Sequence, residues 1–212
     1  MRPSSIAMTS DARIVAVGCL SGATWIVAEP NAEASLIRGD TTPIVGSIFV
    51  DEQDLVTLSA SGLLRRVDHR SGTERWSVQL EPCGMAYQRG SERIVCHDGS
   101  RIHVSLAGAN DIAVTVQLDD GRVHDRVRRL PSVPDSIVGS RSNIVACTYL
   151  PARDEWLVAN DASSLVRLQR DLRGDWSVSG ELHGIPISFM FPTPDSNRAA
   201  CISRTGLGRA QK

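Results

Sequence analysis

The sequence predicts an all-β protein in which one sheet-forming unit is repeated in tandem over 212 residues. A short apolar segment recurs along the chain, and successive segments start 41, 39, 62 and 43 residues apart, which indicates one supersecondary unit copied several times. Between these segments no window places apolar residues at a 3.6-residue period, so neither linking helices nor a helical solenoid is expected. The recurring segments cover residues 14–17, 55–58, 94–96, 156–159 and 199–202.

Each repeat is expected to contain four strands. A turn signal and a second β-like run follow the recurring segment, as at residues 63–67 and 165–168, which is the pattern of β-hairpins. A third run carries the tripeptide Trp-Ser-Val at residues 76–78 and again at 176–178. A leading run, such as residues 44–49, precedes the recurring segment and completes the set.

The recurring segments are nearly continuous apolar runs, which predicts strands that are covered on both faces of their sheet. Four-stranded sheets of about forty residues that stack around an axis form a β-propeller. A β-sandwich is the alternative, because its strands are also short and evenly spaced. The predicted fold class is therefore all-β, a β-propeller-like array of four-stranded blades.

Residues 144–184 resemble a degenerate WD40 repeat, on the segments at 156–161, 165–171 and 181–184. Two positions depart from that family: Gln169-Arg170 replaces its Trp-Asp pair, and His183-Gly184 reverses its Gly-His pair. Residues 71–76 are instead similar to the tryptophan-bearing turn of quinoprotein-type blades. The resemblance implies a WD40-like or quinoprotein-like β-propeller that acts as an interaction platform.

We expect residues 1–212 to form a single β-propeller-like domain with an irregular basic insertion at about 119–143. The 62-residue step exceeds one repeat by too little for another blade, and Pro131 and Pro134 do not suit a central strand. The chain then holds about 4.5 repeats, fewer complete blades than most closed rings need. Three interpretations remain: a partner or second copy covers the open blade edges, five irregular blades close the ring, or the chain is a fragment, which we favour.

Composition excludes several classes of protein. The formal net charge of −1 and the 42% hydrophobic content argue against disorder and against a globally basic nucleic-acid binder. No apolar stretch approaches the length of a membrane span, so no membrane contact is expected. The five cysteines form no C-x-x-C pair, which favours a reducing, cytoplasmic location.

No catalytic residue, metal ligand or cofactor is predicted. The sequence has no phosphate-binding loop, no G-x-S-x-G elbow and no His-Glu-x-x-His pair. His97 and His103 flank the Asp98-Gly99 turn and could converge on a metal ion, but turn chemistry explains the aspartate and a structural role is favoured for the histidines.

The candidate partner-binding residues are Arg122, His124, Arg126 and Arg128. On an extended strand these four side chains share one face, while Val123 and Val127 lie on the other. Such a stripe could bind an acidic or phosphorylated protein surface through forked hydrogen bonds, whereas RNA is not favoured because no aromatic residues interleave it. The alternative is an edge strand made polar against aggregation, with local pairing to aspartates.

These observations predict a non-catalytic protein–protein interaction scaffold. The alternatives are a propeller enzyme of the lactone hydrolase or quinone-dependent dehydrogenase type, and the sensor fragment of a larger multidomain protein. A propeller enzyme needs carboxylates and histidines that converge at one mouth of the channel, and only His97 and His103 suggest such a set.

Overall fold

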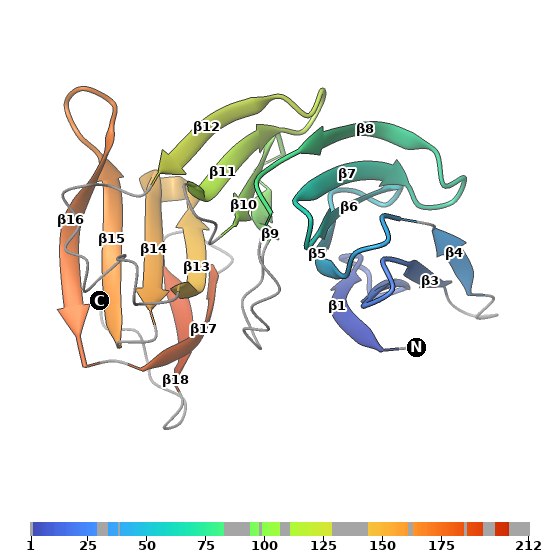
Figure 1. The fold of residues 1–212 in the computed structure, drawn as a ribbon, viewed down its shortest axis with the longest axis horizontal. Helices are drawn as coiled ribbons and strands as arrows, with labels where there is room; N and C mark the ends of the chain where they lie inside the picture. Colours follow the sequence, from blue (N-terminus) through green and yellow to red (C-terminus); the bar gives the residue numbers. More distant parts are fainter. Residues whose placement is uncertain are drawn as a thin grey trace. The chain divides into compact units, whose positions relative to one another are not determined.

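A computed structural model shows a nearly all-β fold, which confirms the predicted fold class (Figure 1). The regular structure consists of short antiparallel strands and one 3-10 turn at Pro151–Arg153. The structure describes residues 2–28, 34–37, 39–82, 94–97, 99–106, 111–128, 144–160, 163–184, 186–192 and 198–203.

Two four-stranded sheets form the first half of the chain. In each of them the strands are hydrogen-bonded in sequence order, so every connection is a hairpin. The first sheet consists of β1 (Pro3–Met8), β2 (Ile14–Cys19), β3 (Thr24–Ala28) and β4 (Ser35–Ile37). The second sheet consists of β5 (Ile44–Phe49), β6 (Asp54–Ser59), β7 (Leu63–Asp68) and β8 (Glu74–Gln79).

The later strands repeat this order. The third sheet consists of β9 (Ile94–His97), β10 (Arg101–Ser105), β11 (Asp111–Gln117) and β12 (Val123–Arg128). The fourth sheet consists of β13 (Ile144–Leu150), β14 (Glu155–Asn160), β15 (Ser164–Arg170) and β16 (Trp176–His183). The described part of the fifth sheet consists of β17 (Ile187–Pro192) and β18 (Ala199–Ser203).

The four predicted strands per repeat are confirmed in four sheets, and the half repeat is the pair β17–β18. Contacts divide the chain into two compact units. One contains residues 1–85, 99–101 and 116–124, and the other contains residues 86–98, 102–115 and 125–212.

The expected insertion at about 119–143 divides into two parts. Val123–Arg128 is not an addition to the repeat but its fourth strand, β12, hydrogen-bonded beside β11. Valines at 123 and 127 give this segment the alternation that a strand on the outer side of a sheet requires. Residues 129–143, including both prolines, lie outside the described residues.

Within the first unit, the core forms where two sheets meet face to face. Ala16, Ile26 and Ile37 of the first sheet pack with Phe49 and Leu55 of the second. All six residues of β6 are buried, as its continuous apolar run predicts. Ser5 and Ser47, whose hydroxyl oxygens are 2.8 Å apart, join β1 to β5 beside this core.

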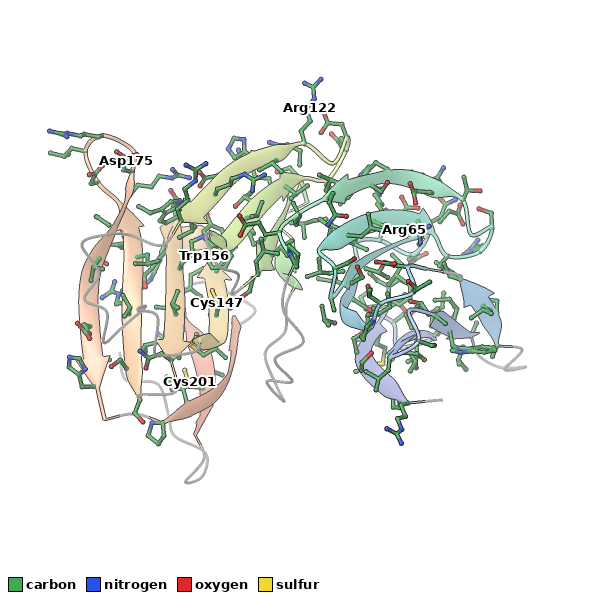
Figure 2. The ribbon with its side chains drawn as sticks, viewed as in Figure 1. Arg65, Arg122, Cys147, Trp156, Asp175 and Cys201 are labelled. Atoms are coloured by element: carbon green, nitrogen blue, oxygen red, sulfur yellow. The ribbon has the colours of Figure 1, made fainter. Side chains whose placement is uncertain are left out.

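Within the second unit, β14 has the same position and is also buried along its whole length. One of its faces packs with Val127 and Cys147 in a core that also contains Trp156 and Trp176. The other face packs on β17 and β18, through Leu157 and neighbouring apolar residues. Figure 2 shows Trp156 and Cys147 within the sheet of β13 to β16.

A buried carboxylate at the start of the second strand recurs in the second and fourth sheets. Asp54 is 5% exposed and accepts a hydrogen bond from Arg66 Nε at 2.8 Å. Glu155 is 1% exposed and accepts hydrogen bonds from Arg167 Nη2 at 2.8 Å and Gln169 Nε2 at 3.0 Å. A buried carboxylate is stable only with such hydrogen-bond donors. The second and fourth sheets therefore both carry an arginine on the third strand, Arg66 and Arg167.

The hairpin between β11 and β12 is held by Trp76 of β8. The Trp76 indole Nε1 donates a hydrogen bond to the Leu118 carbonyl at 2.6 Å, and Arg66 Nη1 donates to the same oxygen at 2.9 Å. Gly121 has φ of +72°, and a Cβ added there would lie 2.8 Å from the Trp76 ring. Both the backbone conformation and the ring therefore require glycine at this position.

We predict that Gly121→Ala destabilises the fold more than Gly72→Ala. Gly72 has the same φ of +72° but nothing within 4 Å of an added Cβ, so its substitution costs only the backbone strain, about 1–2 kcal/mol. Gly121→Ala adds a steric conflict with Trp76, which costs about 1–3 kcal/mol more. Urea unfolding of both variants measures the difference, and equal losses would contradict the packing of Gly121 on Trp76.

Candidate partner-binding surfaces

The predicted basic stripe lies on β12. Arg122, His124 and Arg128 are exposed, Arg126 is half-buried and Val127 is buried, so the expected alternation is present. Figure 2 shows the Arg122 side chain extending outward from the β11–β12 hairpin. His124, Arg126 and Arg128 thus lie along β12, while Arg122 lies in the turn that precedes it.

Several residues of the stripe already have partners within the chain. The Arg122 guanidinium pairs with Asp120 at 3.3 Å, with the arginine side chain 85% exposed. The His124 ring and the Gln117 amide are 3.3 Å apart, and Arg126 and Arg128 also make interactions of their own. Exposed pairs of this kind are weak, so they leave the arginines able to exchange partners.

Asp125, between the stripe residues, points to the opposite side of β12. It accepts a hydrogen bond from Trp176 Nε1 at 2.8 Å and forms an ion pair with Arg170, which also lies over the Trp176 ring at 4.5 Å. Burial raises the pKa of Asp125, but Trp176 and Arg170 outweigh it and hold the pKa below its ordinary value. This carboxylate therefore stabilises the sheet and does not neutralise the stripe.

The outer face of the first sheet is apolar and, among the described residues, partly exposed. The strand register aligns residues of neighbouring strands in rows that run across the sheet. On this face every residue in these rows is hydrophobic. Ile6 is 72% exposed, Met8 58% and Leu36 44%. The rows consist of Ile6, Val17, Trp25 and Leu36, and of Met8, Val15 and Val27. The sequence did not predict this face.

The other face of the first sheet packs against the second sheet, and its polar residues lie near the strand ends. The middle of the first sheet is therefore apolar on both faces. A contiguous exposed apolar patch marks an interaction surface more often than it occurs by chance on a monomer. Strands β6 and β14 are buried on both faces, whereas the outer face of the first sheet exposes its apolar residues beyond the cover that the described residues of its own unit provide.

A cavity of about 400 Å³ opens at the turn end of the first and second sheets, within the first unit. Its apolar lining is Ile14, Ile26 and Ala28, from the same face that forms the core. Its polar lining comes from three hairpin turns and includes two arginines, two carboxylates and one histidine. Sequence analysis missed this cavity because each turn alone has ordinary turn chemistry.

Of the histidine pair considered for a metal, the structure describes the side chain of His103 alone. His103 is 1% exposed, its Nδ1 lies 3.1 Å from Thr115 Oγ1, and its ring stacks on Tyr149 at 3.7 Å. Asp98 and the side chain of His97 lie outside the described residues. Across the part of the chain that the structure describes, no three histidine, cysteine or acidic side chains gather as metal ligands.

The residues that replace the WD40 signature make different contacts. Gln169 reaches Glu155, and Arg170 reaches Asp154 at 3.1 Å in addition to Asp125. His183 Nδ1 lies 3.0 Å from Ser164 Oγ.

Among the described residues, no helix has the length and apolar character to cross a membrane.

Comparison with known proteins identifies the fold. No protein-family model and no curated protein sequence matches the chain. A chain in the crystal structure of the mitotic checkpoint complex is similar, with a TM-score of 0.68 and 10% identity over 98% of this chain and 63% of that one. BamB from Moraxella catarrhalis is similar with a TM-score of 0.66 and 12% identity, over 96% of this chain and 59% of BamB.

Both similar structures are β-propellers, the first of the WD40 type. The chain therefore has a β-propeller-like fold, in which the described residues form four four-stranded sheets and one two-stranded sheet. It spans less than two thirds of the length of either similar chain.

Proposed function

We propose that this protein is a non-catalytic scaffold that binds another protein through the outer face of its first sheet. The observation that carries the proposal is the exposure of Ile6, Met8, Val27 and Leu36 on a face without a charged residue in its cross-strand rows. Burial of apolar area is the main driving force of protein association, and this face offers it in one continuous sheet.

The partner's contact surface is an apolar sheet face. The opposite side of the same sheet is covered in that way, because Phe49, Leu55 and Val67 of the second sheet pack against it. The cross-strand apolar rows of this face are complementary to those of another sheet. A second copy of this chain or a different propeller-type protein meets this requirement, and the proposal includes the cytoplasmic location expected from the cysteines.

The basic stripe on β12 is the second contact surface in this proposal. Exposed Arg122, His124 and Arg128 suit an acidic or phosphorylated protein surface, which arginine can bind through two parallel hydrogen bonds. Charges at the edge of an interface mainly increase the association rate and select the partner. The apolar face provides affinity and the stripe provides selection.

We expect the double variant Ile6→Glu/Leu36→Glu to lose its partner. Both side chains are exposed, so the charges are tolerated in the free chain but not beneath a second sheet. Light scattering after size exclusion gives the native mass, and capture from a lysate of the source cells reveals a stoichiometric companion. Leu172→Glu, at a fully exposed loop position, is the control. A companion retained by the double variant, or a monomer without companion, would disprove this interface.

The triple variant Arg122→Ala/Arg126→Ala/Arg128→Ala should weaken capture of the same companion and reduce its sensitivity to salt. Arg2→Ala/Arg153→Ala/Arg173→Ala removes the same charge from exposed positions elsewhere and should bind normally. Thermal unfolding of both variants separates lost binding from lost stability. Unchanged recovery and unchanged salt dependence would remove the stripe from the proposed surface.

A further inference from the structure

The cavity at the turn end of the first and second sheets contains a histidine whose second nitrogen has no partner. His69 is 4% exposed, and its Nε2 lies 2.9 Å from the Glu52 carbonyl oxygen. Because a carbonyl can only accept, Nε2 carries the hydrogen and Nδ1 is left as an acceptor. Nδ1 makes no hydrogen bond to any residue that the structure describes. An acceptor without a partner on a cavity wall is suited to an N–H or O–H group of a ligand.

Two arginines that line the same cavity can bind a carboxylate of a ligand. Arg70 has no ion pair with any carboxylate of the described residues, and the Nε of Arg13 is 3.7 Å from Asp11. Asp11 is already satisfied, because it accepts hydrogen bonds from Thr9 Oγ1 at 2.7 Å and from the Arg13 amide at 3.1 Å. The Thr9 bond, with that of Arg13, holds the pKa of Asp11 below its ordinary value.

The charge balance of the lining disfavours a simple anion. Arg13 and Arg70 are offset by Asp11 and Glu52, so inorganic phosphate gains little from the site as a whole. A ligand gains most if its carboxylate meets the arginines while an adjacent N–H donor meets His69. The apolar lining of Ile14 and Ile26 then accommodates a hydrophobic group on the same ligand.

We propose that this cavity binds an α-carboxylate next to an N–H donor and an aliphatic side chain. A free apolar amino acid and the C-terminal residue of a peptide both carry these groups. The volume of about 400 Å³ falls within the range of small-ligand sites and is too small for a folded element. The site is separate from the outer face of the first sheet, so it can exist whether or not that face binds a partner.

Calorimetric titration of the full chain with four compounds tests the ligand chemistry. We expect saturable binding of L-leucine or N-acetyl-L-leucine, and no binding of N-acetyl-L-leucinamide, which lacks the carboxylate, or of inorganic phosphate. Binding of N-acetyl-L-leucine identifies a peptide end, and binding of L-leucine alone identifies a free amino acid. No saturable binding of either up to about 10 mM, or equal binding of the amide or of phosphate, would overturn the proposal.

Variants assign the contacts. Arg13→Ala/Arg70→Ala should weaken binding about tenfold or more, while Arg153→Ala/Arg173→Ala should leave it unchanged. His69→Gln keeps a donor for the Glu52 carbonyl and removes the Nδ1 acceptor. The wild-type chain should bind N-acetyl-L-leucine about 2–10-fold more tightly than 4-methylpentanoate, which has no N–H, and His69→Gln should abolish that preference. Unchanged affinity in the arginine variant would overturn the proposal even if His69→Gln fails to fold.

Discussion

The structure depends on the burial of sheet faces against neighbouring sheets. Each hairpin-connected sheet is too thin to exclude water alone, so its apolar residues are stable only when another sheet covers them. The cores on either side of β14 and between the first two sheets all follow this rule. Polar contacts then fix the details: the buried Asp54 and Glu155 each require an arginine, and the Trp76 and Trp176 indoles each donate to a group on the chain.

Proposed binding sites arise where this repetition is interrupted. Within the described part of the first unit, the second sheet covers one face of the first sheet, and the other face exposes apolar residues such as Ile6 and Met8. The cavity near His69 lies where the packed core ends and the hairpin turns separate. The outer strand β12 carries basic residues on one face, while Val127 packs in the core and Asp125 binds Trp176 on the other face. One architecture therefore produces an apolar, a basic and a mixed surface.

The sequence was sufficient for the class of fold, because period-2 strands, hairpin turns and the forty-residue repeat are local signals. It also predicted the alternation on β12. It did not identify β12 as the fourth strand of a blade, because the 62-residue step between recurring segments assigned this segment to an insertion. The cavity was not predictable either, since Arg13 and His69 are more than fifty residues apart in sequence and meet only through packing. The apolar outer face could not be predicted without the strand register, because the exposure of a strand face depends on the neighbouring sheets and not on the sequence of the strand itself.

Hydrogen exchange of β2 and β6 tests the role of face burial most directly. Both strands are second in their sheets and are hydrogen-bonded on both edges, but β6 is buried along its whole length, whereas Val15 and Val17 on the outer face of β2 are only half-buried. If covering by neighbouring sheets stabilises the fold, amides of β6 exchange at least about tenfold more slowly than those of β2. Equal protection of the two strands would show that hydrogen bonding within each sheet is enough, and would contradict the account.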